Sequence, residues 1–208
     1  MNDSFVMYRL PHETIYTIIR QCDGEPEILS SYTDLNGRTG FVFSPFIIST
    51  EHPLLLVRPD EIKICRINDC EEFEPLAFCS RDIENEHRQY KADFRKFHSR
   101  LNKSEFRKIV LARSCEETAC EEILPELIFK RACRMYPNEF IALVSTPYSG
   151  TWLMATPETL VEGHNKEWYT VALAGTKRMD VIDESEVQID DVHAFNAFVN
   201  YDLFIKKG

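Results

Sequence analysis

The chain has 208 residues, of which 44% are hydrophobic, and its 24 basic and 34 acidic residues give a net charge of −10. This composition is typical of a globular protein with a sizeable core and excludes disordered, collagen-like and low-complexity chains. An acidic chain binds nucleic acid and anionic membranes poorly, so we expect neither as a partner. No apolar run approaches the ~20 residues of a membrane helix, and the N-terminus does not resemble a secretory signal. These features predict a cytoplasmic protein.

The first part of the chain, residues 1–80, is predicted to be rich in short strands. The dipeptide Asn36-Gly37 is a turn signal, and it precedes a predicted strand at 39–43. The apolar run at 54–57 has the length of a buried strand, and a further strand is predicted at 63–67.

Two later stretches have the apolar spacing of amphipathic helices. The first, residues 82–101, is predicted to be a surface helix that covers a sheet. The second, residues 121–135, is predicted to end before Pro137. The apolar stripe of the first helix contains Ile83, Tyr90, Phe94, Phe97 and Leu101, and that of the second contains Leu124, Leu127, Ile128, Ala132 and Met135.

Further strands are predicted around these helices. Residues 108–113 predict a buried strand, and residues 140–145 and 151–155 predict a hairpin that turns through Tyr148-Ser149-Gly150. A third strand is predicted at 168–174. The loop before this strand is predicted at Gly163-His164-Asn165. The fold class that follows is α+β, with a mixed or antiparallel sheet and packed helices. The predicted division is a strand-rich region at 1–80, a second domain at 81–177 and a divergent tail at 178–208.

The seven cysteines are scattered and form no C-x-x-C pair. The pairs Cys65/Cys70 and Cys115/Cys120 have no nearby histidine that would complete a zinc site. We therefore predict free, mostly buried thiols in a reducing compartment and assign no metal ligand.

Lys108 is the first candidate for chemistry. On a strand it would share one face with Val110 and Ala112. Apolar surroundings lower the pKa of a lysine, which could then act as a general base. A lysine at a strand end with its ammonium in water explains the same pattern.

The second candidate is Glu158, in the sequence Thr156-Pro157-Glu158. A threonine followed by proline and an acid is typical of a helix N-terminus, which accounts for the glutamate structurally. In a closed pocket, however, burial would raise the pKa of a carboxyl group and leave it protonated as an acid.

The third candidate is the segment Ala172-Leu173-Ala174-Gly175-Thr176. A glycine at a strand end lets the backbone approach a ligand closely, and its amide can donate to a carboxylate. A plain turn explains the same residues.

In combination these segments resemble the chorismate-utilising enzymes, and within them isochorismate synthase. The resemblance rests on the order of 107–113 (RKIVLAR), 155–158 (ATPE) and 172–176 (ALAGT). The segment 40–46 (GFVFSPF) is more loosely similar to the amino-terminal region of bacterial isochorismate synthases. The useful resemblance covers residues 36–176, and it implies a partial chorismate-binding fold, similar to that of anthranilate synthase component I, with residues 81–177 as the partial chorismate-binding domain.

The resemblance implies a Mg²⁺-dependent isomerase that converts chorismate to isochorismate in menaquinone or siderophore biosynthesis. In this reaction water adds at C2, the C4 hydroxyl leaves and the double bonds shift. By position, Lys108 matches the family lysine that activates water, and Glu158 matches the glutamate that protonates the leaving hydroxyl. Ala174, Gly175 and Thr176 match the segment that lines the substrate pocket.

Two residues discriminate between the relatives. Anthranilate synthases resemble this pattern but lack the lysine at position 108, and aminodeoxychorismate synthases carry a lysine at the position of Ala174. The presence of Lys108 with Ala174 favours water as the nucleophile. Salicylate synthase shares both features and stays an alternative.

The resemblance stops near Thr176, although family members are much longer and their later half supplies the Mg²⁺ ligands. This predicts a truncated chain whose Mg²⁺ ligands are not found here. An inactive fragment that serves as an interaction module, through self-association or with a complementing chain, is the second hypothesis. The acidic run at 180–191 does not have the spacing of the family's metal ligands and is typical of a solvated surface.

Overall fold

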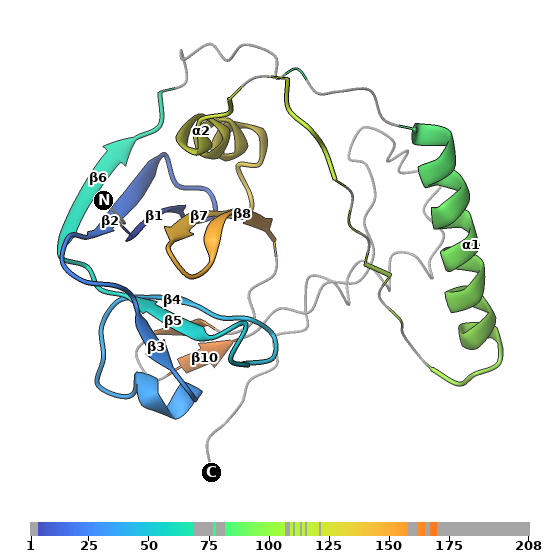
Figure 1. The fold of residues 1–208 in the computed structure, drawn as a ribbon, viewed down its shortest axis with the longest axis horizontal. Coiled ribbons are helices and arrows are strands. Elements are labelled where there is room, and N and C mark those ends of the chain that lie inside the picture. Colours follow the sequence, from blue (N-terminus) through green and yellow to red (C-terminus); the bar gives the residue numbers. More distant parts are fainter. Residues whose placement is uncertain are drawn as a thin grey trace. The chain divides into compact units, whose positions relative to one another are not determined.

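The structure is a computed structural model, and helices and antiparallel strands occur in it together (Figure 1), which confirms the predicted α+β class. The chain divides into two compact units, Met1–Glu71 with Pro125–Gly208, and Glu72–Leu124. The predicted division at residues 80 and 177 stays a prediction. The residues that the structure describes are 4–68, 77, 82–106, 109, 111–112, 114, 116–120, 122–157, 162–164 and 167–169.

A five-stranded sheet forms the centre of the first unit, with the strand order β6-β2-β1-β7-β8 (Figure 1). All four neighbouring pairs are antiparallel. Successive side chains of a strand point to opposite faces, so this sheet has two faces that need cover. Its strands are β1 (Ser4–Arg9), β2 (Ile15–Gln21), β6 (Glu61–Arg66), β7 (Phe140–Thr146) and β8 (Gly150–Thr156).

Helix α2 (Pro125–Met135) packs on one face of this sheet. Phe129, Ala132 and Cys133 are spaced by three and four residues, so they lie on one side of the helix, and all three are buried. Phe129 meets Tyr16 of β2 edge-on, with 5.4 Å between ring centroids. The apolar contacts of α2 thus connect it to the middle of the sheet.

The structure corrects two predictions about α2. The helix begins at Pro125 rather than at residue 121, because proline fits the first helical turn and disfavours a helical residue before it. The predicted apolar stripe is also not the buried one, since Leu127 and Met135 are exposed and only Ala132 of that set is buried. The helix has two apolar stripes, and the contact with Tyr16 selects the one that contains Phe129.

A small sheet, β3-β5-β4, covers part of the opposite face. Its middle strand β5 is buried along its whole length, as the apolar run LLLV predicts. Val57 packs against Val6 and Val144 of the large sheet, whereas Leu54 and Leu56 face the other way, toward Leu29. The first unit therefore has α2, the large sheet and the small sheet as three layers. The remaining elements here are β3 (Glu27–Leu29), the 3-10 helix η1 (Tyr32–Leu35), β4 (Phe41–Phe43) and β5 (Leu54–Val57).

Gly40 allows β4 to approach β5 closely. Its φ of +158° lies in a region that side chains rarely adopt, and a Cβ atom there would lie 2.5 Å from the carbonyl oxygen of Val57. Both the backbone conformation and the space therefore require glycine at this position.

We expect Gly40→Ala to destabilise the fold by about 3 kcal/mol, because overpacking and backbone strain add at one site. Gly37→Ala is the matched control, since Gly37 also has a positive φ but has open space around its Cα. It should cost only about 1 kcal/mol. Urea denaturation of both variants measures the difference, and equal losses would contradict the steric explanation.

The β7–β8 hairpin forms where the sequence predicts it. Thr146 pairs with Gly150, and Gly150 has the positive φ of +68° that glycine tolerates in a turn. Tyr148 in this turn donates a short hydrogen bond to a carboxylate oxygen of Glu25, which lies between β2 and β3. This bond raises the pKa of Tyr148, with smaller contributions from burial and from the charge of Glu25.

We therefore expect Tyr148 to ionise above the pH at which an ordinary tyrosine does. Because its pKa is raised in the folded state, its contribution to stability is present below the unfolded pKa and is lost as the pH rises through the folded pKa. The difference in tyrosinate absorbance between the wild type and Tyr148→Phe isolates this titration. In the Glu25→Gln background this titration of Tyr148 should move to lower pH. The control is the corresponding absorbance difference between the wild type and Tyr32→Phe, which Glu25→Gln should leave unchanged. An unchanged Tyr148 titration in Glu25→Gln would be the contrary result.

The second unit contains helix α1 (Ile83–Asn102), which confirms the helix predicted at 82–101. Asp82 caps its first turn by accepting a hydrogen bond from the backbone N–H of Asn85. None of its residues is buried. That this helix covers a sheet stays a prediction. No helix in the described part of the chain is both long and apolar enough to cross a membrane.

Candidate active site

Strand β8 leads directly to the predicted acid. Thr156 is the last residue of β8 and pairs with Phe140, the first residue of β7. Pro157 follows outside the strand. Glu158 lies outside the described residues, so the predicted helix start and the predicted acid both stay predictions. The hairpin register nevertheless fixes where the chain leaves the sheet before Glu158.

The segment that carries the predicted base is described only in part. Ile109, Leu111 and Ala112 belong to no strand, and Ala112 is exposed, so the buried strand predicted at 108–113 is wrong at these positions. An apolar β-branched run forms a strand only where a neighbouring strand takes up its backbone hydrogen bonds. Lys108 itself lies outside the described residues, and its role as a base stays a prediction.

The predicted substrate-binding segment follows a short hairpin of strands β9 (Glu162–His164) and β10 (Glu167–Tyr169). The loop predicted at 163–165 is thus partly wrong, because Gly163 and His164 belong to β9. The pairing of His164 with Glu167 leaves only two connecting residues, a length typical of β-hairpins. The strand predicted at 168–174 begins within β10. Ala174, Gly175 and Thr176 lie outside the described residues.

The described surface includes open hollows that the sequence did not predict, among them the following two. One, of about 300 Å³, lies beside the end of α2 and includes His12, Cys133 and Arg134 among its lining residues. Burial raises the pKa of the Cys133 thiol, although a hydrogen bond from Arg9 opposes the shift. A protonated, buried thiol is a poor nucleophile, so this hollow has no evident nucleophile. The other hollow, of about 370 Å³, lies at β2 and β6 and includes Arg20 and Lys63.

The described cysteines correct the prediction of mostly buried thiols. Cys22 and Cys120 are exposed, Cys65 is half-buried, and Cys133 is the only one of these four that is buried. The sequence pattern around a cysteine did not reveal whether its strand or loop would be covered.

Mg²⁺ is bound by carboxylate oxygens and water in an octahedral arrangement. Among the residues that the structure describes, no three His, Cys, Asp or Glu side chains lie close enough together to hold a metal ion. We therefore assign no Mg²⁺ ligand among these residues and no chemical step to the ion.

Comparison with known families identifies the class of the protein. The family model described as chorismate binding enzyme matches residues 60–192, so the chain belongs to that family. The match includes the segments of Lys108, of Glu158 and of Ala174 to Thr176, and it makes chorismate the small-molecule substrate that the family implies. No curated protein and no solved structure matches the chain.

Proposed function

We propose that this protein is an isochorismate synthase, with Lys108 as the base and Glu158 as the acid. The observation that carries the proposal is that one family match spans all three motif segments in order. The combination of Lys108 with Ala174 supports water, rather than ammonia or an enzyme amine, as the nucleophile.

The proposed reaction is an isomerisation in which one water enters and one leaves. Lys108, in its neutral form, accepts a proton from water, and the water oxygen bonds to C2 of chorismate. The double bonds shift and the bond from C4 to its hydroxyl breaks. Glu158, in its protonated form, gives its proton to the leaving hydroxyl, which departs as water. Such a pair needs surroundings that lower the pKa of the amine and raise that of the carboxyl group.

The backbone of Gly175 and the neighbouring Ala174 and Thr176 are proposed to line the substrate pocket. A glycine amide can donate to a substrate carboxylate without a side chain in the way. The methyl group of Ala174 supplies no amine at the position where aminodeoxychorismate synthases carry a lysine. This arrangement would orient chorismate while Lys108 and Glu158 act from opposite faces of the ring.

The test is to incubate the purified chain with chorismate, with and without Mg²⁺, and to detect pyruvate in the presence of an added isochorismatase. We expect pyruvate only when both Mg²⁺ and isochorismatase are present. Pyruvate without isochorismatase would favour the salicylate synthase alternative. A folded sample that leaves chorismate unchanged under all conditions would contradict the proposed activity and favour the interaction-module hypothesis.

A further inference from the structure

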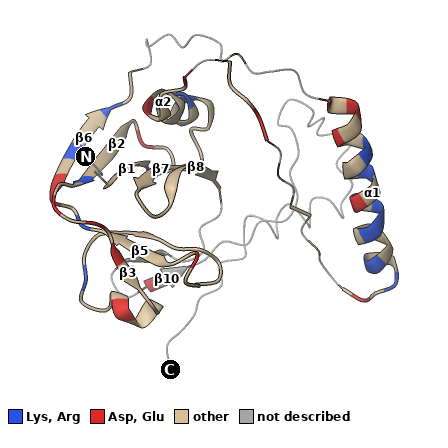
Figure 2. Cartoon of the chain, viewed as in Figure 1, with Lys and Arg blue, Asp and Glu red and all other residues tan. Residues whose placement is uncertain are grey.

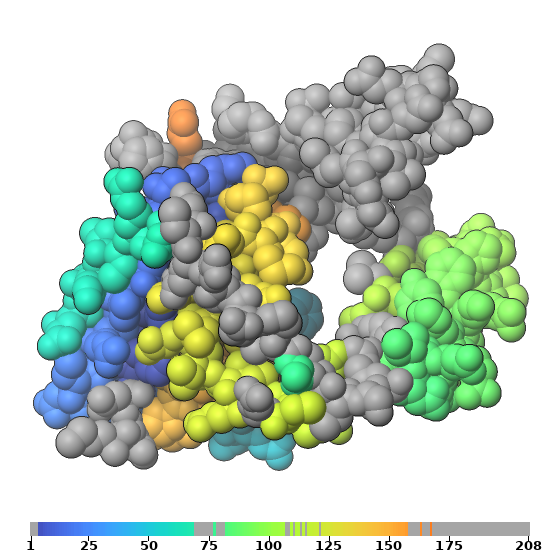
Figure 3. Space-filling model, turned by 90° about the horizontal axis from the view of Figure 1, so that it is seen from above, coloured from blue at the N-terminus to red at the C-terminus, as the bar shows by residue number. Residues whose placement is uncertain are grey.

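The two edge strands of the five-stranded sheet, β6 and β8, differ in charge. Strand β6 pairs with β2 on one side and with no described strand on the other, and β8 is the opposite edge. β6 carries acidic and basic residues, whereas β8 carries none (Figure 2). In Figure 3 the teal residues of β6 lie at the margin of the molecule. The free edge of β6 therefore presents both backbone groups and charges.

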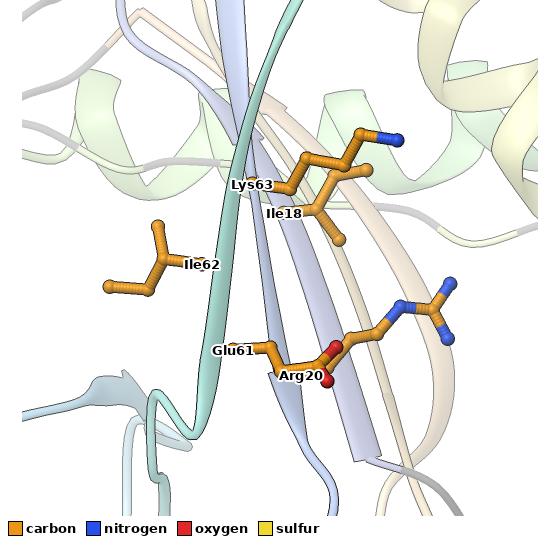
Figure 4. A pocket seen from close by; sticks show the side chains of 5 residues that line it. All are labelled: Ile18, Arg20, Glu61, Ile62 and Lys63. Atoms are coloured by element: carbon orange, nitrogen blue, oxygen red, sulfur yellow. The ribbon is translucent and has the colours of Figure 1, made fainter.

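The side chains of β6 alternate between the two faces of the sheet. Figure 4 shows Lys63 on the same side as Ile18 and Arg20 of β2, whereas Ile62 points to the other side. Ile62 is 62% exposed and Ile64 is 66% exposed. Ile62 lies opposite Ile19, on the sheet face against which the small sheet packs. Because strands normally bury one apolar face, these two isoleucines are an uncovered apolar part of that face.

The order Glu61-Ile62-Lys63 is self-complementary when two copies of β6 run antiparallel. If Ile62 faces Ile62 of a second copy, then Glu61 lies opposite Lys63 of that copy, and the same pair occurs twice. Within one chain Glu61 also lies opposite Arg20. Each Glu61 would thus lie between two cations, one from its own chain and one from the second copy.

Charged residues on an edge strand commonly prevent strand pairing, because they meet apolar groups or like charges on a neighbour. In this register Glu61 and Lys63 meet opposite charges instead, which stabilises a cross-strand pair and fixes its alignment. A strand that is added to a sheet edge also gains backbone hydrogen bonds.

From this charge complementarity we infer that β6 is an interaction surface for a second copy of this chain. Antiparallel pairing of β6 with β6 joins the two five-stranded sheets around a two-fold axis, with Ile62 against Ile62 at the centre. A two-fold axis makes the contact self-limiting, so the product is a dimer rather than a fibre. One short strand pair is a small interface, so we expect a weak dimer that forms with increasing concentration.

Sedimentation velocity over a range of protein concentrations tests this inference. We expect the wild type to dimerise, and Glu61→Lys and Lys63→Glu each to weaken the dimer by about tenfold or more, because each change creates two like-charge pairs. The double variant E61K/K63E should regain most of the lost affinity, because both pairs between the two chains are again of opposite charge, although position 61 then meets Arg20 of its own chain with a like charge. An equimolar mixture of the two single variants should form a mixed dimer, since both charge pairs between the two chains are then of opposite sign.

Matched controls are Glu84→Lys and Lys103→Glu, which make the same charge changes at exposed positions of α1 and at its end. They should dimerise as the wild type does. Circular dichroism checks that each variant is folded. The mixing experiment uses only variants whose spectrum matches that of the wild type. A wild type that is monomeric at every concentration, or single variants that dimerise normally, would overturn the inference, as would a mixture that stays monomeric. Chorismate turnover does not enter this test, so its outcome is independent of the proposed function.

Discussion

Replacing Lys108 with alanine is expected to lower isochorismate formation by about 10²- to 10⁴-fold, which is the usual contribution of a general base. The reason is that water is a weak nucleophile unless a positioned group removes its proton. Glu158→Gln should cause a loss of similar size, because an amide of the same shape cannot protonate the leaving hydroxyl. Both are measured as kcat/KM for chorismate in the isochorismatase-coupled assay.

Two exposed residues provide the controls for these variants. Lys103→Ala makes the same lysine-to-alanine change at the end of α1, and Glu126→Gln makes the same carboxyl-to-amide change in the first turn of α2. Both should retain wild-type turnover. Thermal unfolding should be the same for all four variants, so that a loss of activity reports chemistry rather than folding. Undiminished turnover in Lys108→Ala would remove this residue from the proposed mechanism.

The second large effect is expected at Arg9, a buried cation of β1. Its side chain is only 1% exposed, and no carboxylate among the described residues pairs with it. The guanidinium instead donates to carbonyl oxygens at the C-terminal end of α2 and just beyond. These are the carbonyls of Cys133 at 3.4 Å, of Pro137 at 2.5 Å and of Tyr136. The end of a helix carries partial negative charge and unpaired carbonyl groups, so a cation there satisfies both.

We expect Arg9→Met to destabilise the fold by about 2 to 3 kcal/mol, because it removes the charge-assisted hydrogen bonds to all three carbonyl groups. The carbonyls of Pro137 and Tyr136 keep a backbone donor each, from His12 and Glu139, which limits the loss. Arg9→Lys should lose less stability than Arg9→Met but should stay below the wild type, since a single ammonium group cannot reproduce the planar set of donors of a guanidinium. The measurement is the free energy of unfolding from urea denaturation.

Arg88→Met on the exposed surface of α1 is the matched control and should change the stability by less than about 0.5 kcal/mol. If Arg9→Met unfolded at the same urea concentration as the wild type, the contacts of Arg9 with the end of α2 would not be important for stability.

Elements with a complete local signal could be predicted from the sequence. The β7–β8 hairpin has two apolar runs and a glycine in the turn, and α1 has a capping aspartate at Asp82 and an apolar stripe. Such signals act between residues that are close in the chain, so they do not depend on the rest of the fold. The hairpin β9–β10 was only partly predicted, because His164 resembles a loop residue but pairs with Glu167.

The assignment of the candidate site rests on the sequence more than on the structure. Lys108, Glu158 and Ala174 to Thr176 lie outside the described residues, so their roles rest on the motifs and on the family match. The structure adds the position of the chain just before Glu158, because it places Thr156, the last residue of β8, opposite Phe140.

The sequence by itself determined the α+β class, the positions of the locally signalled elements and the membership of the chorismate-binding family. Only the tertiary structure decided the strand order β6-β2-β1-β7-β8 and which apolar stripe of α2 is buried. It also placed Arg9 against Pro137, a residue 128 positions away. The physical reason is that strand pairing, helix packing and the partners of a buried charge depend on contacts between distant residues. The local periodicity of a sequence contains no information about which distant surfaces will meet.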